Sequence, residues 1–293
     1  MHLKLTAADK TDVGKQRDQN EDYAYKRVES SEDGDRGLFI VADGMGGYKA
    51  GEVASRLAVE TISKELDFFF KPLHDQPTVK LEKADLDPEK TVKIETTAST
   101  TAQQKTQKLP ETQAVSFVGD QLEAAIQQAN IAIVSYGEKK SSARGLGSTV
   151  TAALLQNDQA YIANVGDSRT YLMRGNELKP VTRDHSLVAR LVESKQIEPD
   201  DIYTHPQRNL IYRSLGAGHK HVEVDIFHLI LQPGDKLLLC SDGLWEMIRH
   251  QDLLKTFEEQ TSPQGICDQL IKLANANGGE DNISAVVVQV NTF

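Results

Sequence analysis

The placement of acidic residues constrains this chain more than any other feature of its sequence. Four times an aspartate adjoins a short apolar run at a strand-like boundary. Asp43 follows LFIVA, Asp167 follows YIANVG, Asp242 follows KLLLCS, and Asp281 precedes ISAVVVQV. Short apolar runs bounded by glycine, aspartate or asparagine are typical of buried strands. The sequence therefore predicts a strand-rich core in which several strands carry a carboxylate at one end.

The connections between these runs indicate how the strands pair. The runs at 148–155, 159–165 and 168–174 are separated only by Asn157-Asp158 and Gly166-Asp167, which are typical hairpin pairs. We also predict strands at 23–25, 222–231, 236–240 and 283–290, and helices at 51–70, 115–138, 250–258 and 262–276. Tight turns join antiparallel strands, so the pattern favours an antiparallel α+β sandwich over a doubly wound parallel sheet.

Two stretches differ from this regular pattern. Residues 71–114 contain several prolines and many Lys, Glu, Thr and Gln residues but few apolar ones. We interpret them as a disordered insertion or long surface loop in a single domain of residues 1–293, with a docking or regulatory tether as the alternative. Residues 180–215 are polar and mixed, which indicates a surface subdomain.

Charge and cysteine content exclude several classes of protein. The net charge is −10, whereas nucleic-acid-binding proteins carry a basic face. No apolar run approaches the length of a membrane span, and the first residues show no signal peptide. The two cysteines, Cys240 and Cys267, do not support a disulfide framework. We therefore expect a cytoplasmic protein without nucleic-acid or membrane partners.

Each acidic residue also has an ordinary interpretation. Asp-Gly is a common turn pair, so Asp43-Gly44 alone would indicate a turn, and Glu21-Asp22 could be an exposed pair. If the strand ends converge, however, bare carboxylates would repel one another unless a cation compensates them. Oxygen ligands without a Cys or His cluster favour Mg²⁺ or Mn²⁺ over zinc.

Arg17 adds a second element to this argument. A guanidinium can bind two phosphate oxygens with its planar fork, so an acidic cation site with one arginine suits a phosphate ester. The alternative for Arg17 is a surface salt bridge with Glu21 or Asp22. The chain has no GxxxxGK[ST] loop, which argues against a nucleotide triphosphatase.

Five segments in order resemble the motifs of one family. They are RDQNED (17–22), VADGMGG (41–47), NVGDSR (164–169), LCSDGLWE (239–246) and GGEDNIS (278–284). The chain resembles the bacterial form of the type-2C metal-dependent serine/threonine protein phosphatases, the PPM family, everywhere except 71–114. The resemblance implies an α-β-β-α sandwich of two antiparallel sheets flanked by helices. It also implies a metal site at one edge and a flap at about 182–205 that influences substrate choice.

The resemblance further implies the metal ligands. Asp43, Asp242 and Asp281 would bind the first Mn²⁺ or Mg²⁺ ion. Glu21, Asp43 and the Gly44 carbonyl would bind the second, so that Asp43 bridges the two ions. Asp167 and Asp242 resemble the pair that holds a third, weaker ion in bacterial members.

Catalytic roles follow from the same resemblance. Asp22 would orient metal-bound water and Arg17 would hold the substrate phosphate, while water bridging the ions attacks the phosphorus of phosphoserine or phosphothreonine. Many eukaryotic members have a histidine where this chain has Met45, so the leaving-group acid is unassigned. The partners implied are phosphorylated proteins and an opposing serine/threonine kinase, and we expect a monomer.

Three alternatives remain open at the level of sequence. The first is a pseudophosphatase, or phosphoprotein-binding regulator without turnover, and the retained acids argue against it. The second is a phosphatase dedicated to one regulatory antagonist, which would often carry a sensory domain. The third is a phosphatase of nucleotides or small molecules, which would use the same metals but work poorly on phosphoproteins.

Overall fold

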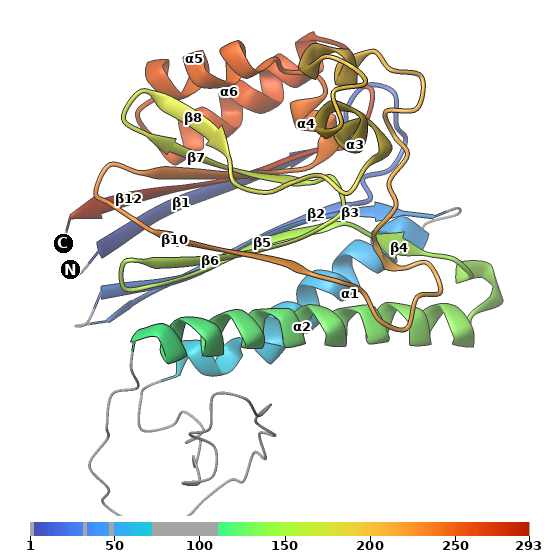
Figure 1. Cartoon of the computed structure of the whole chain (residues 1–293), viewed down its shortest axis with the longest axis horizontal. Coiled ribbons are helices and arrows are strands. Elements are labelled where there is room, and N and C mark those ends of the chain that lie inside the picture. The colour runs from blue at the N-terminus through green and yellow to red at the C-terminus, as the bar shows by residue number, and fades with distance from the viewer. Residues whose placement is uncertain (1–2, 32–33, 47–49, 72–110, 293) are drawn as a thin grey trace, which may run out of the picture.

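Two antiparallel sheets lie face to face between two layers of helices in the computed structural model (Figure 1). The structure describes residues 3–31, 34–46, 50–71 and 111–292, without the side chains of 111–116. Every strand pairing among these residues is antiparallel. The expected α-β-β-α sandwich is therefore confirmed.

The strands divide into a five-stranded and a seven-stranded sheet. The five-stranded sheet has the order β1 (Leu3–Asp12), β12 (Ile283–Thr292), β11 (Lys236–Cys240), β7 (Arg169–Arg174) and β8 (Glu177–Pro180). The other has the order β10 (Asp225–Ile230), β6 (Gln159–Val165), β5 (Val150–Gln156), β3 (Gly34–Met45), β4 (Gly147–Ser148) and β9 (Leu215–Gly216), and β2 (Asp22–Ser31) pairs with β3.

The long helices cover the outer faces of the sheets (Figure 1). Helices α1 (Ala50–Glu65) and α2 (Glu111–Lys139) pack on the seven-stranded sheet, and α5 (His250–Glu259) and α6 (Pro263–Ala276) pack on the other. Two shorter helices, α3 (Leu187–Glu193) and α4 (Asp242–Trp245), lie near one end of the sandwich. Short 3₁₀ turns occupy Asp67–Phe70, Ser141–Ala143 and Pro199–Tyr203.

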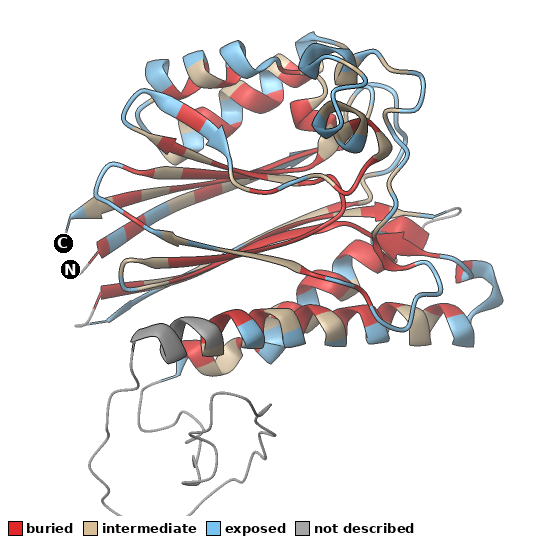
Figure 2. Cartoon of the chain, viewed as in Figure 1, coloured by how far each residue is buried: buried red, intermediate tan, exposed pale blue. Residues whose placement is uncertain are grey.

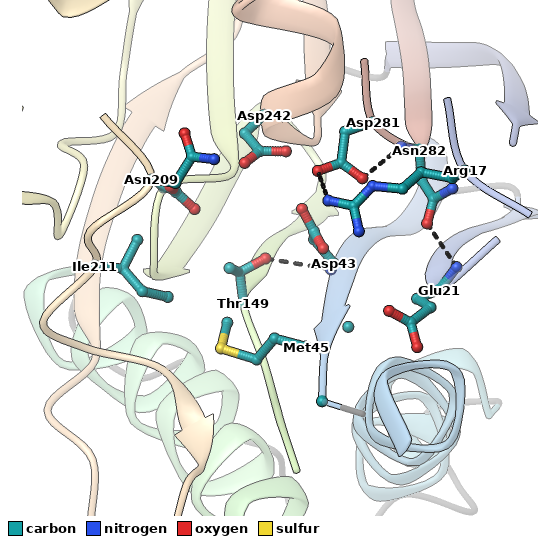
Figure 3. A pocket seen from close by; sticks show the side chains of 13 residues that line it. Arg17, Glu21, Asp43, Met45, Thr149, Asn209, Ile211, Asp242, Asp281 and Asn282 are labelled. Atoms are coloured by element: carbon teal, nitrogen blue, oxygen red, sulfur yellow. Dashed lines mark hydrogen bonds and ion pairs between the residues drawn. The ribbon is translucent and has the colours of Figure 1, made fainter. Parts of the chain in front are cut away.

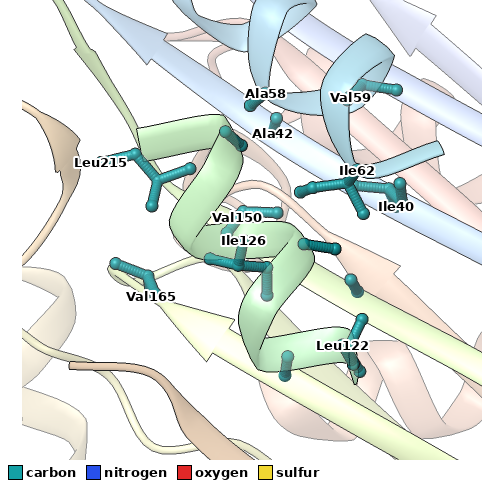
Figure 4. Packing of buried hydrophobic residues seen from close by; sticks show 14 of the residues in the cluster. Ile40, Ala42, Ala58, Val59, Ile62, Leu122, Ile126, Val150, Val165 and Leu215 are labelled. Atoms are coloured by element: carbon teal, nitrogen blue, oxygen red, sulfur yellow. The ribbon is translucent and has the colours of Figure 1, made fainter. Parts of the chain in front are cut away.

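Buried side chains form three layers, one between the sheets and one beneath each pair of helices (Figure 2). Strand β3 shows why its sequence is continuously apolar. Leu38, Ile40 and Ala42 face helices α1 and α2, while Phe39 and Val41 face the other sheet. Figure 4 shows the layer between the seven-stranded sheet and helices α1 and α2. A strand that is buried on both faces carries no polar alternation, because neither face meets water.

The structure confirms the strand at 283–290 and the hairpin at Asn157-Asp158, where Asn157 has φ 58° between β5 and β6. It contradicts the hairpin expected at Gly166-Asp167. Strands β6 and β7 belong to different sheets, so this segment crosses from one sheet to the other. Asp43-Gly44 is not a turn either, because β3 continues to Met45 and pairs with β4.

The expected insertion at 71–114 falls mainly on 72–110, which lie outside the described residues. Helix α2 begins at Glu111, four residues before the start that we expected for it. No helix in the described ranges combines the length and apolar character that a membrane span requires.

Candidate active site

The strand register brings the acidic residues to one end of the sandwich. Asp22 begins β2 opposite Asp43 near the end of β3. Strand β11 ends beside the start of β12, since Ser241 N donates a hydrogen bond to Ser284 O at 3.2 Å. Val150 pairs with Val165, so the crossover that carries Asp167 leaves β6 at the same end. Antiparallel pairing thus places the end of one strand beside the start of the next.

Seven of the eight predicted site residues line one pocket of about 270 Å³ (Figure 3). They are Arg17, Glu21, Asp43, Gly44, Asp167, Asp242 and Asp281. The four aspartates of the strand-end pattern, Asp43, Asp167, Asp242 and Asp281, therefore lie together in this pocket. The pocket is also lined by Met45, Gly46, Thr149, Asn209, Ile211 and Asn282, which we had not predicted as site residues.

Asp22, the eighth residue, is buried behind this pocket with only 7% of its surface exposed. Its Oδ2 accepts a 2.7 Å hydrogen bond from Ser241 Oγ. Its Oδ1 is buried and has no hydrogen-bond partner among the described residues. Asp242 Oδ1 is likewise buried and has no hydrogen-bond partner among the described residues. Unpaired buried carboxylate oxygens are costly, so these atoms indicate a missing donor or cation.

Burial and mutual repulsion shift the pKa values of these acids upwards. Burial is the main reason that the pKa of Asp22 rises to about 7 and that of Asp242 to about 6. The pKa values of Asp43 and Asp167 rise well above their ordinary range for the same reason, with neighbouring carboxylates adding to the shift. A divalent cation would remove this penalty, because it stabilises the ionised form of each acid.

Glu21 precedes β2, and its side chain lies beside the first turn of helix α1, apart from the aspartates (Figure 3). Burial raises its pKa, while hydrogen bonds from the backbone of Gly51 and Glu52 act in the opposite direction. A Cβ on Gly51 would lie 2.7 Å from the Glu21 carboxyl carbon, and a Cβ on Gly44 would lie 2.1 Å from Gly51 O. Glycine is therefore required at both positions for β3, α1 and Glu21 to meet.

Arg17 forms an ion pair, but with a partner that the sequence did not suggest. Its Nη2 lies 2.7 Å from Asp281 Oδ2, and half of the Arg17 side chain is exposed. Neither Glu21 nor Asp22 is its partner. In this arrangement no three His, Cys, Asp or Glu side chains of the described ranges form a group that could already hold a metal ion. The donor chemistry fits Mg²⁺ or Mn²⁺, since the acids supply only hard oxygen atoms.

The backbone of Asp43 is fixed by two residues of the neighbouring segment. Asp43 N donates to Thr149 Oγ1 at 3.2 Å, and Thr149 N donates to Asp43 O at 2.8 Å. Ser148 Oγ also donates to Asp43 O, at 3.0 Å. These contacts orient Asp43 without using its carboxylate, which stays available to the pocket.

Asn282 connects the N-terminal loop to the far end of the chain. Its Oδ1 accepts from Glu21 N at 2.8 Å, and its Nδ2 donates to Val13 O at 2.9 Å and Gln19 O at 2.8 Å. The side chain is nearly fully buried. The sequence offered only its position beside Asp281 as a signal, because its partners are distant along the chain.

The wall opposite Arg17 and Glu21 comes from the segment after the expected flap (Figure 3). Asn209 and Ile211 line the pocket there, whereas no residue of 182–205 does. The buried His185 supports this wall, since its backbone O accepts from Tyr212 N at 2.9 Å. Its Nδ1 accepts from Gly166 N at 3.0 Å, next to Asp167.

Trp245 fixes the backbone of the crossover segment that carries Asp167. Its Nε1 donates to Asp167 O at 2.9 Å, and the Arg169 guanidinium stacks over its ring at 3.5 Å. Arg169 is bound by Asp184 through contacts of 2.6, 2.9 and 3.1 Å. Asp167 is thus placed by a buried aromatic residue and a buried ion pair.

Replacement of Ser241 by alanine should destabilise the fold through Asp22. The variant removes the 2.7 Å donor to Asp22 Oδ2 and the acceptor of the 3.0 Å bond from Ser284 N. We expect the free energy of unfolding to fall by about 1–3 kcal/mol, since buried polar atoms lose their partner. Urea denaturation measures this. Ser63→Ala in helix α1 is the matched control, since the Ser63 hydroxyl makes only an exposed hydrogen bond to Glu60 O, and equal losses in the two variants would contradict the interpretation.

The comparisons with known proteins agree with this geometry. A family model described as Protein phosphatase 2C matches residues 15–273. A Listeria welshimeri protein named serine/threonine phosphatase stp is 37% identical over 96% of this chain and 94% of its own length. The Streptococcus pneumoniae protein phosphatase PhpP is 30% identical over 96% of each chain.

Solved structures give the same result. The crystal structure of the Mycobacterium tuberculosis serine/threonine phosphatase PstP/Ppp superimposes with a TM-score of 0.74 at 30% identity, covering 99% of this chain and 100% of that one. A second structure is the catalytic domain of PstP in complex with two manganese ions. It has a TM-score of 0.73 at 30% identity and covers 99% of both chains.

Proposed function

The chain belongs to the protein phosphatase 2C family. From that membership we propose a role in dephosphorylation for each predicted site residue. It is a metal-dependent hydrolase that removes phosphate from phosphoserine and phosphothreonine on proteins. Its site takes two Mn²⁺ or Mg²⁺ ions. The observation that carries the assignment of residues is the single pocket lined by Arg17 and five carboxylates, Glu21, Asp43, Asp167, Asp242 and Asp281.

We assign the ions to these carboxylates. Asp43, Asp242 and Asp281 would hold one ion, and Glu21, Asp43 and the Gly44 carbonyl would hold the other. Asp43 is suited to the shared position, because its backbone is held by Thr149 and Ser148 and its carboxylate lies in the pocket beside that of Asp242. Asp167 and Asp242 would hold a third, weaker ion, and the burial that raises the pKa of both carboxylates would favour a cation beside them.

When bound, the ions activate a water molecule for attack on phosphorus and offset the charge of the phosphoryl oxygens. Asp22, which is buried behind the pocket, would orient that water, since its Oδ1 has no hydrogen-bond partner among the described residues. Ser241 fixes the other oxygen of Asp22 and so sets the direction of Oδ1. When substrate binds, Arg17 leaves its ion pair with Asp281 and donates two parallel N–H hydrogen bonds to the substrate phosphate. Positioning and electrostatics therefore supply most of the rate.

We propose a cytoplasmic monomer of one catalytic domain, 1–293, that opposes a serine/threonine kinase. In this proposal 71–114 is an insertion between α1 and α2, and 182–205 acts as a flap that supports the wall at Asn209 and Ile211. The pseudophosphatase alternative has no support from the pocket, since every acid that the ions need is present.

Chelation of the metal should abolish activity. With a phosphothreonine peptide and Mn²⁺, the purified chain is expected to release phosphate. EDTA should reduce the rate to background, because the carboxylates alone cannot activate water. Malachite green detection of phosphate measures this, and added Mn²⁺ should restore the rate. Turnover that persists in EDTA would contradict the metal-dependent mechanism, and no turnover by folded, Mn²⁺-loaded protein would favour a binding-only protein.

A further inference from the structure

A second hollow of about 500 Å³ continues the active-site pocket on the outer side of Arg17. The two hollows share Arg17, Glu21, Gly46 and Asn282 as walls. The residues that only the second one uses are Gln16, Asp18 and Gln19, all in the loop before β2. A substrate whose phosphate contacts Arg17 would therefore have neighbouring atoms over this hollow.

The loop that lines this hollow has a fixed backbone. Lys15 N and Gln16 N donate to Gly279 O at 2.8 and 3.2 Å. At its other end, Asn282 Nδ2 donates to Gln19 O at 2.8 Å. A loop that is tied at both ends loses little further entropy when it binds a ligand, which is the condition for a preorganised binding surface.

The side chains that this loop presents are not used within the protein. Gln16, Asp18 and Gln19 are exposed, and none has a side-chain hydrogen bond or ion pair with the rest of the described chain. The two charged side chains that both hollows share already have partners: Arg17 pairs with Asp281, and Glu21 accepts hydrogen bonds from the backbone of Gly51 and Glu52. Among the described residues that line this hollow, Asp18 therefore supplies the one charge that has no partner within the protein.

We propose that this hollow is a substrate subsite for the residues that flank the phosphorylated one, and that Asp18 makes it selective for lysine or arginine there. The proposal rests on the phosphatase function proposed above. An extended peptide advances about 3.3–3.6 Å per residue, so a residue one to three positions from the phosphothreonine reaches across the shared walls. Gln16 and Gln19 can donate to and accept from the peptide backbone.

The test compares peptides within one enzyme. Two pairs of phosphothreonine peptides carry either lysine or glutamate, one pair on the N-terminal side and one on the C-terminal side. For wild type with Mn²⁺, kcat/KM should favour lysine by about 1.5-fold to fivefold on one side, the range of an exposed ion pair. Added salt should reduce that ratio. In Asp18→Lys the ratio should fall to one or below.

Glu258→Lys is the matched control, since it makes the same change in net charge on the exposed surface of α5. It should keep the wild-type ratio. A wild-type ratio of one on both sides, or an equal fall in both variants, would overturn the subsite and leave only a general charge effect. Hydrolysis of p-nitrophenyl phosphate by wild type separates the two proposals: its absence, together with inert peptides, would instead reject the phosphatase mechanism.

Discussion

Asp43→Asn is expected to lower kcat by about 10³-fold, while leaving the metal-free protein as stable as wild type or more so. The catalytic loss should match or exceed the loss for one transition-state contact, on the order of 10²–10³-fold, because Asp43 would serve both ions. The stability effect has the opposite sign. Burial and neighbouring carboxylates raise the pKa of Asp43, so its ionised form opposes folding, and the neutral amide removes that penalty.

Two measurements on the same samples test this prediction. Phosphate release with saturating Mn²⁺ gives kcat, and thermal melting with and without Mn²⁺ gives stability. Wild type should melt at a higher temperature with Mn²⁺, whereas the variant should lose most of that shift. Asp268→Asn is the control, because its carboxylate is exposed on α6 and pairs only with surface groups. A variant that keeps wild-type turnover would remove Asp43 from the metal centre.

Asp184→Asn should cause the largest loss of stability, although Asp184 does not line the pocket. The variant leaves the Arg169 guanidinium, whose side chain is 13% exposed, without its carboxylate. Removal of one partner from a buried ion pair costs about 3–5 kcal/mol, a large part of the stability of an ordinary domain. Because Arg169 stacks on Trp245, the support of Asp167 should weaken as well.

Urea denaturation measures this loss, with the slope of the transition as a check that the unfolded state is unchanged. Asp268→Asn again serves as the control. Its partner Lys10 is 39% exposed, so its removal should cost less than about 1 kcal/mol. A loss below that value for Asp184→Asn would show that water or another acid compensates Arg169.

The sequence marked four aspartates that line the pocket through a local signal. Asp43, Asp167, Asp242 and Asp281 each lie beside an apolar run, and a run of β-branched and aliphatic residues identifies a buried strand without knowledge of its partner. The sheet to which a strand belongs is not local information. Gly166-Asp167 has the composition of a hairpin turn, yet it crosses between sheets, because β6 pairs with β5 and β10 while β7 pairs with β8 and β11.

Residues whose role depends on distant partners could not be recognised in the same way. Asn282 contacts Glu21 across 261 positions, and Asn209 and Ile211 reach the pocket only because their segment packs against His185 and Leu187. No periodicity marks such residues. The ion pair of Arg17 with Asp281 joins residues 264 positions apart, whereas the sequence pointed only to the neighbouring Glu21 or Asp22 as a partner.

The joining of the two ends of the sequence in one pocket has a consequence for synthesis on the ribosome. Arg17 and Asp281 are 264 positions apart, and strand β1 pairs with the last strand, β12. At about 5–20 residues per second, roughly 10–50 s pass between the two residues during translation. The nascent chain can form the β5–β6 hairpin in that interval, but it has no complete active site. Phosphatase activity therefore begins only after Asp281 has emerged, so an unfinished chain cannot dephosphorylate its substrates.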